Sequence, residues 1–344
     1  MRKYFWFLPL LLLLGSLKAF PQVAKIDSSA LFTDDRTIEL TLTTDFKKLL
    51  AGKLKMTEQP ATFTIKLPDS SVYAGEIGIR ARGITRKQSC RMPPIMLNFK
   101  TANSGGLRPL HKLKLVCGCS QGADNEKLLL KEYLAYKIYN HLTDMSFRVR
   151  LAHITYEDSK GKQKTYSQYA FLIEDASAMA KRNNCKDLQK VAYNTESTQR
   201  KQMTLVALFE YMIGNSDWSV PNYHNIKLLL SRKDLNAPPY VVPYDFDYAG
   251  LVNAYYAVPL EDNDDSKSVL DREYRGFARS TAELEETISF LNTKKEAIKN
   301  LVMNFEPLNE KSRKEAMGYI EDFYKIINDK SQVETKFIKE ARKQ

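Results

Sequence analysis

The sequence predicts an α+β protein built from two lobes, and two patterns carry this prediction. Alternating apolar and polar residues, typical of strands, dominate the first half, whereas amphipathic helical patterns dominate the second half. The 344 residues, of which 43% are hydrophobic, are enough for one large or two ordinary domains. We therefore expect a strand-rich N-lobe with one major helix over 20–176 and a mainly helical C-lobe over 177–344.

The first 19 residues have the pattern of a secretory signal peptide. Arg2 and Lys3 precede an apolar run from Tyr4 to Leu14, and a cleavage site follows Ala19. The run is short for a membrane-spanning helix, and an uncleaved anchor is the alternative. Cleavage removes three basic residues and lowers the formal net charge from +11 to +8. We expect an exported protein, periplasmic or secreted, with no integral membrane segment after cleavage. The absence of any Asn-x-Ser/Thr sequon favours a bacterial export route.

The strands of the N-lobe follow from patterns of period two. In TIELTLT, Ile38 and Leu40 alternate with polar residues. In EIGIRARG, the isoleucines share one face, while Arg80 and Arg82 share the other. A helical pattern over 126–142 then interrupts the strands, with Asp124 as its expected N-cap. The expected strands lie at 37–43, 62–67, 76–83, 95–99, 112–116, 149–158 and 165–174.

The helical patterns of the second half have recognisable ends. A helix that starts near residue 198 is expected to stop at Gly214, because glycine readily adopts the left-handed conformation that ends many helices. Ser280 and Glu283 form a capping box at the start of a long amphipathic pattern. A further amphipathic helix follows over 317–327.

A predicted β-hairpin lies between these helices and brings polar residues together. Residues 226–230 alternate as one strand, a segment rich in turn residues follows, and 240–244 form the second strand. Asn225 stands just before the first strand and Asp245 just after the second, so the two should meet at the open end of the hairpin. Asp217 lies on the loop that enters the hairpin.

The oxygen-bearing side chains of 217–247 suit a hard cation. Carboxylates are costly to dehydrate unless they are paired or bound to a metal. Mg²⁺ keeps several waters and commonly takes one or two carboxylates plus substrate phosphates. Asn225, Asp245 and Asp247 are the expected ligands, and Asp217 is the expected base that orients a hydroxyl, as in phosphoryl transfer by kinases. Each of these residues alone is also a common cap or turn former, and only the ordered set favours chemistry.

Phosphoryl transfer also requires a cation from the first lobe. Lys112 and Lys114 share one face of the strand that precedes the 126–142 helix, and Glu132 lies in that helix. A lysine paired with Glu132 would reproduce the ion pair of kinases, and we favour Lys114. The simpler alternative for either lysine is a solvated strand face.

Together these segments resemble the spore-coat-protein-H-like (CotH) kinases, a secreted branch of the atypical protein-kinase-like fold, and especially their exported bacterial relatives. The resemblance implies a two-lobed protein-kinase-like fold, ATP with Mg²⁺ or Mn²⁺, and phosphate transfer to a protein or small molecule. It also implies a catalytic base at Asp217, metal ligands at Asn225 and Asp245, a Lys114–Glu132 pair, and Glu174 at the adenine. The matching segments span most of residues 76–279 and are IRARGITR, KLKLV, KEYLAYKIY, YAFLIE, GNSDW, HN, VPYDFD and DREYRGFAR.

The sequence departs from the kinase pattern in two places. The usual spacing from the base to the metal-binding asparagine selects Asn222, but we prefer Asn225 because the strand starts directly after it. No Gly-x-Gly-x-x-Gly loop is present. Arg80, Arg82 and Arg86 are expected to hold phosphates instead, since arginine suits bidentate phosphate contact. A charged strand edge is the alternative reading of these arginines.

The four cysteines bear on folding. An even number in an exported chain indicates disulfides, and Cys90 and Cys119 flank neighbouring predicted strands, so we expect them to pair. Cys117 stands too close to Cys119 for a typical zinc knuckle.

Three functions remain open from the sequence. The first is an ATP- and metal-dependent phosphotransferase, with a nucleotide and an unknown acceptor as partners. The second is a catalytically inactive relative that serves as an exported binding or scaffolding protein, because ATP is scarce outside the cytosol. The third is a carbohydrate-active enzyme. It would use an acid pair from 217–247, with Trp218 stacking on sugar, or it would hold a metal and a nucleotide sugar at Asp245-Phe246-Asp247. Nucleic-acid binding is not expected, because the basic residues are not clustered with aromatic ones.

Overall fold

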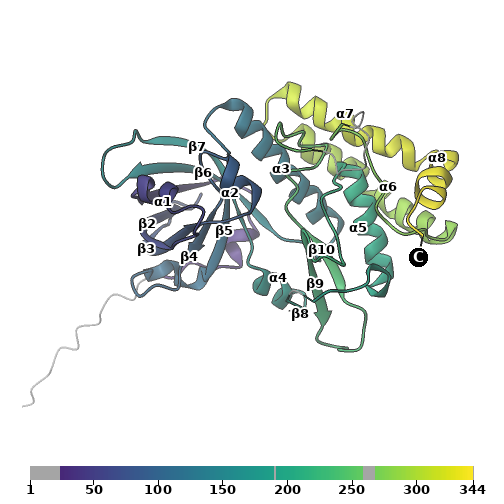
Figure 1. Cartoon of the computed structure of the whole chain (residues 1–344), viewed down its shortest axis with the longest axis horizontal. Coiled ribbons are helices and arrows are strands. Elements are labelled where there is room, and N and C mark those ends of the chain that lie inside the picture. Colours follow the sequence, from purple (N-terminus) through teal and green to yellow (C-terminus); the bar gives the residue numbers. More distant parts are fainter. Residues whose placement is uncertain (1–23, 190, 259–267, 344) are drawn as a thin grey trace, which may run out of the picture.

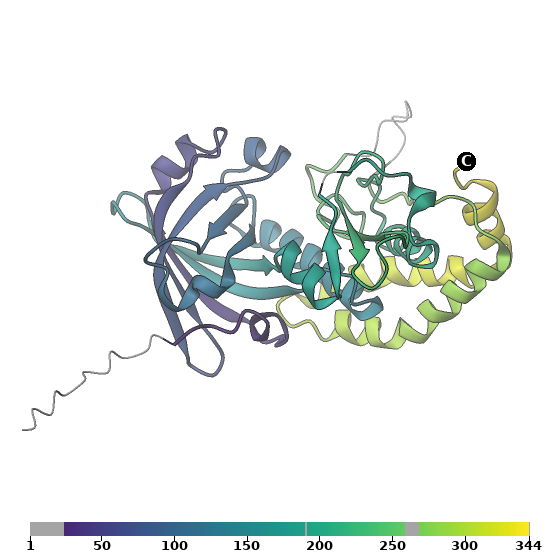
Figure 2. The ribbon, with the colours of Figure 1, turned by 90° about the horizontal axis from the view of Figure 1, so that it is seen from below.

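Seven strands of the first part of the chain form a closed barrel, and a mainly helical part follows it. The computed structural model describes residues 24–189, 191–258 and 268–343. The expected signal peptide therefore lies outside the described residues. The barrel and the helical part lie side by side in both Figure 1 and Figure 2. The boundary that we expected between the N-lobe and the C-lobe, after residue 176, falls at the start of α4 (Ala176–Arg182).

The barrel corrects the predicted fold class. Its strand order is β1-β2-β3-β4-β5-β7-β6, and β1 pairs in parallel with β6, from Ile38 opposite Ala152 to Thr44 opposite Asp158. All other neighbours in the barrel are antiparallel. This closure replaces the two-lobed protein-kinase-like fold that we expected. The strands are β1 (Ile38–Thr44), β2 (Gln59–Lys66), β3 (Val72–Ala81), β4 (Ile95–Asn98), β5 (Lys112–Cys117), β6 (Val149–Asp158) and β7 (Tyr166–Ile173).

The alternation in the strands divides their side chains between two faces of the barrel. Leu40, Phe63, Leu97 and Leu115 belong to one apolar cluster that fills the interior. Val116 and the other outward-facing apolar residues of β5, β6 and β7 join a second cluster with the helices. Lys112 and Lys114 alternate with the interior residues of β5 and so project from the outer face.

The helical part packs against that outer face through α3 (Ala123–Leu142). This helix lies between the barrel and the other long helices (Figure 1) and contacts β6, β7 and α6. A small sheet in the order β10-β9-β8 lies in the helical part, formed by β8 (Cys185–Asp187), β9 (Ile226–Ser231) and β10 (Tyr240–Pro243). The remaining helices are α1 (Phe46–Ala51), α2 (Thr85–Ser89), α5 (Arg200–Ile213), α6 (Thr281–Met303), α7 (Glu310–Ile327) and α8 (Lys330–Glu334).

Several local predictions are confirmed. Gly214 ends α5 with φ of 66°, and the capping box of Ser280 and Glu283 starts α6. The disulfide between Cys90 and Cys119 is present, whereas Cys117 and Cys185 are free and buried. The N-cap prediction for α3 was wrong. The helix begins one residue before Asp124, which instead lies in the first turn, where a carboxylate favours the helix dipole.

Among residues 24–189, 191–258 and 268–343, none of the helices combines the length and the apolar character that crossing a bilayer requires.

Barrel closure makes a testable prediction about the β1–β6 seam. Ile154 on β6 faces Leu40 on β1 and is fully buried. We expect Ile154→Ala to lower the free energy of unfolding by about 2–5 kcal/mol, because it leaves a cavity in the barrel core. Thr62→Ala on the exposed face of β2 should change it by less than about 0.5 kcal/mol. Urea denaturation measures both, and similar small losses for the two variants would contradict the closed barrel.

Candidate functional site

A cavity at the junction between the barrel and the helical part gathers most of the predicted site residues. Its volume is about 310 Å³. Lys114 and Arg82 reach it from the barrel, and the loop and hairpin of the helical part complete it. The polar and charged residues that line it are Arg82, Thr85, Arg86, Lys114, Asp217, His224, Asn225, Asp245 and Asp247, together with Tyr223, Tyr244 and Tyr248.

The loop after α5 and the base of the hairpin are joined by side-chain hydrogen bonds. Asn225 Nδ2 donates to the Asp217 carbonyl oxygen at 2.8 Å and to Asp217 Oδ2 at 3.0 Å. His224 Nε2 lies 2.8 Å from Asp217 Oδ1. Asn222 is exposed and does not line the cavity. The structure therefore places Asn225, rather than Asn222, beside the predicted base.

Asp245 is held at the open end of the hairpin, as predicted. The Tyr244 amide donates to the Asn225 carbonyl at 3.0 Å, and the Asp245 amide donates to the hydroxyl of Tyr136 on α3 at 2.8 Å. Asn225 and Asp245 have φ of 50° and 70°. Such left-handed conformations cost residues other than glycine on the order of 1–3 kcal/mol and are concentrated at functional sites. The buried ring of Phe246 packs on Tyr136, which fixes the chain between Asp245 and Asp247.

Lys114 faces this cavity as expected, but its predicted partner is different. Its ammonium lies 4.3 Å from the ring centroid of Tyr244. Within the described part of the chain, no ion pair joins Lys114 to Glu132. Burial and the positive charge of Arg82 lower the pKa of Lys114 to about 7, although Asp245 acts in the opposite direction.

Glu132 instead contacts Arg86. Arg86 Nη1 lies 3.5 Å from Glu132 Oε2 and 3.9 Å from Asp247 Oδ2, and all three side chains are buried. Burial raises the pKa of Glu132 well above its ordinary value. Burial, and after it the carboxylate of Asp245, raise the pKa of Asp247 to about 6, against the lowering effect of Arg86. The predicted Lys114–Glu132 pair is therefore corrected, because α2 inserts an arginine between α3 and the hairpin.

Three other predicted residues lie outside this cavity. Lys112, two residues before Lys114 on β5, is exposed and does not line the cavity. Arg80 projects toward Met56 at 3.7 Å. Glu174 is buried against Arg182, with Nε and Oε1 3.0 Å apart, and lines a separate cavity of about 530 Å³. The structure therefore places Glu174 outside the cavity that Lys114 and Asp245 line, and its role at the adenine stays a prediction.

A pair of buried residues that the sequence patterns did not indicate supports the Asp217 loop. Glu210 Oε2 accepts a hydrogen bond from Asn215 Nδ2 at 2.9 Å, and Asn215 Oδ1 accepts one from the Asp217 amide at 3.1 Å. Burial raises the pKa of Glu210 well above its ordinary value, and the hydrogen bond from Asn215 offsets only part of this rise. An acid within an otherwise apolar stretch of α5 was the available signal.

The donor set fits a hard cation that shares its coordination with water and phosphate. Within the described ranges, no three His, Cys, Asp or Glu side chains come close enough to hold a metal by themselves. Mg²⁺ does not require such a cage, because it keeps waters and takes substrate phosphates. Asn225, Asp245 and Asp247 line one cavity and offer oxygen atoms to it.

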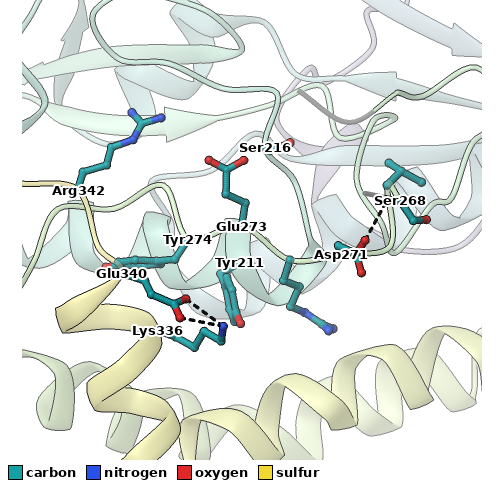
Figure 3. A pocket seen from close by; sticks show the side chains of 11 residues that line it. Tyr211, Ser216, Ser268, Asp271, Glu273, Tyr274, Lys336, Glu340 and Arg342 are labelled. Atoms are coloured by element: carbon teal, nitrogen blue, oxygen red, sulfur yellow. Dashed lines mark hydrogen bonds and ion pairs between the residues drawn. The ribbon is translucent and has the colours of Figure 1, made fainter. Parts of the chain in front are cut away.

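A second cavity of about 300 Å³ begins at Ser216, the residue before Asp217. Figure 3 shows the side chains around it, which come from α5, from 268–274 and from the C-terminal segment. Its charges are largely engaged with one another or with backbone: Lys336 pairs with Glu340 at 2.9 Å, and Asp271 accepts from the Ser268 amide at 2.7 Å. None of the predicted site residues lines it, so the candidate site is the cavity at the junction.

Comparison with known proteins adds no assignment. The chain matches no family model, and no curated protein matches it significantly. The resemblance to CotH-like kinases therefore stays a prediction from the motifs.

The lowered pKa of Lys114 predicts a pH dependence of stability. Between pH 7 and the ordinary lysine value of 10.5, the unfolded chain binds more protons at this residue than the folded chain, so stability rises with pH. Relative to Lys114→Met, wild type should gain up to about 1 kcal/mol per pH unit over this window. Denaturation of both proteins at pH 7, 8.5 and 10 measures the difference between their free energies of unfolding. A difference that does not change with pH would contradict the lowered pKa of Lys114.

The support under the Asp217 loop predicts a stability effect. Asn215→Ala should lower the free energy of unfolding by about 1–3 kcal/mol, because it leaves the buried carboxyl of Glu210 without its donor. Asn222→Ala, on the exposed part of the same loop, is the matched control and should change stability by less than about 0.5 kcal/mol. Thermal or urea unfolding measures the stability of both variants. Equal losses of stability would contradict a supporting role of Asn215 under the Asp217 loop.

Proposed function

We propose that this protein transfers a phosphoryl group from a nucleoside triphosphate, bound with Mg²⁺ or Mn²⁺, to a hydroxyl of a protein or small molecule. One observation carries the proposal. A lysine and an arginine from the barrel face an ordered set of Asp217, Asn225 and Asp245 from the helical part across one cavity. Cations opposite oxygen ligands are what a metal-bound polyphosphate requires.

Each residue has a role in this proposal. Asn225, Asp245 and Asp247 would hold the metal, which supplies charge neutralisation at the phosphate oxygens. Lys114 and Arg82 would bind phosphate oxygens from the barrel side of the cavity. Lys114 would act as a compact positive charge, and the planar guanidinium of Arg82 could contact two oxygens at once. Asp217 would accept a hydrogen bond from the attacking hydroxyl and orient it. His224 and Asn225 hold this carboxylate in one orientation, which favours catalysis by positioning.

The carbohydrate alternative loses one of its supports in this geometry. Trp218 is 4% exposed and packs in the core, so its ring is not available to stack on sugar. Arg82 and Lys114 would also have no role in hydrolysis of a neutral glycoside. The inactive binding protein is a further alternative, and it predicts the same cavity without turnover.

We expect the purified mature protein to transfer the γ-phosphate of ATP in the presence of Mg²⁺ or Mn²⁺. Asp217→Asn should lower the rate by about 10²–10⁴-fold with a small effect on nucleotide binding, because it removes the orienting base. Asp245→Ala should abolish metal-dependent stabilisation by nucleotide, because it removes a metal ligand. Radiolabelled phosphate transfer and thermal shift measure the two effects.

Asp234→Asn is the matched control, since this exposed aspartate lies at the far end of the same hairpin and should leave both readouts unchanged. Nucleotide-dependent stabilisation without transfer to any acceptor, including water, would favour the binding protein. Loss of neither readout in Asp245→Ala would reject this cavity as the site.

A further inference from the structure

Arg86 is the most unusual charge near the candidate site. It lies on α2, a helix of only five residues, yet its side chain is buried in the wall of the cavity. Its guanidinium reaches two acids from different parts of the chain, Glu132 of α3 at 3.5 Å and Asp247 beyond the hairpin at 3.9 Å. It also donates from Nη2 to the Cys117 carbonyl oxygen. One cation thus connects the barrel, the central helix and the predicted metal-binding segment.

The acids around Arg86 depend on it for charge compensation. Glu132 and Asp247 are 2% and 5% exposed, so solvent screens neither of them well. Tyr256 donates to Asp247 Oδ2 at 3.2 Å, but a hydroxyl offsets less charge than a guanidinium. Without Arg86, two buried carboxyl groups would face each other with no cation between them, which is unfavourable.

The segment that carries Arg86 is held mainly at its C-terminal end. Ile84, Gln88 and Ser89 are exposed, and α2 buries little besides Arg86 itself. The helix ends at Cys90, which is bonded to Cys119 at the start of the turn into α3. The Met92 amide also donates to the Cys119 carbonyl at 3.1 Å. The disulfide therefore ties the short helix to the same turn whose Cys117 carbonyl receives Arg86.

We propose that Arg86 is a positioning residue that holds Asp247 and Glu132 in place for the metal and nucleotide, and that the Cys90–Cys119 disulfide fixes the helix from which it acts. The assignment of Asp247 to a metal site rests on the proposed function, whereas the mechanical link between disulfide, Arg86 and Asp247 does not. Reduction should then loosen not only α2 but also residues 244–257, although these are far from both cysteines in the sequence.

Hydrogen exchange followed by mass spectrometry tests the link without any ligand. In oxidised wild type, peptides covering 85–92 and 244–257 should both be protected. Reduction, Cys90→Ser/Cys119→Ser and Arg86→Gln should each speed exchange in 244–257 by about tenfold, because each removes the same restraint. The triple variant, with Arg86→Gln and both serine substitutions, should exchange in 244–257 little faster than either change alone. Arg86→Lys should recover part of the protection that Arg86→Gln loses.

Arg80→Gln is the matched control, because it removes a nearby arginine that does not reach the cavity. It should leave exchange in 244–257 unchanged. If reduction loosens 85–92 alone, the role of the disulfide is overturned; if Arg86→Gln leaves 244–257 protected, the role of Arg86 is overturned. Reduced wild type keeps the test valid should Arg86→Gln fail to fold.

Nucleotide binding with Mg²⁺ gives the functional readout. Arg86→Gln and the reduced protein should bind ATP–Mg²⁺ about tenfold more weakly than oxidised wild type, and Arg86→Lys should lie between them. If oxidised wild type itself fails to bind ATP–Mg²⁺, the proposed function is rejected, while the exchange data still decide whether Arg86 and the disulfide hold Asp247. Equal affinity in oxidised wild type and Arg86→Gln would overturn the positioning role.

Discussion

The parallel pairing of β1 with β6 is the constraint on which the rest of the structure depends. It joins the two ends of a seven-stranded sheet, so every strand of this sheet is paired on both sides and has one face turned inward. The inner face must then be apolar, and the outer face must be either solvated or covered. Because α3 covers β6 and β7, the cavity forms where that cover ends, beside the outward-facing Lys114 of β5.

The junction between barrel and helices explains why so many charges are partly buried. Lys114, Arg82 and Arg86 come from the barrel side, and Asp217, Asp245 and Asp247 come from the helical side. Bringing the two surfaces together removes water from both sets, which shifts the pKa of Lys114 down and that of Asp247 up. Such opposed shifts within one cavity are typical of sites that bind or transform a charged ligand.

The hairpin contributes rigidity where the chemistry is proposed. Antiparallel pairing of β9 with β10 places Asn225 beside Tyr244, and the turn out of β10 is fixed by the hydroxyl of Tyr136 and by the buried ring of Phe246. Two residues with left-handed backbone are tolerated there because the surrounding contacts over-determine their conformation. A loop without these contacts would not hold Asp217, Asn225 and Asp245 against one another.

Most strands, the long helices α3, α5, α6 and α7, the capping box, the end of α5 and the meeting of Asn225 with the start of the Asp245 turn were determined by the sequence alone. These features depend on periodicity, turn chemistry and pairing across a short hairpin, all of which are local. Alternation shows which residues of a strand share a face, but it does not name the neighbouring strand, so only the tertiary structure decided that β1 closes on β6 more than a hundred residues later. The same reason explains the partner of Glu132. The sequence pattern does not say whether Lys114 or Arg86 contacts Glu132. The packing of the five-residue helix α2, which the disulfide ties to the turn before α3, places Arg86 next to this acid.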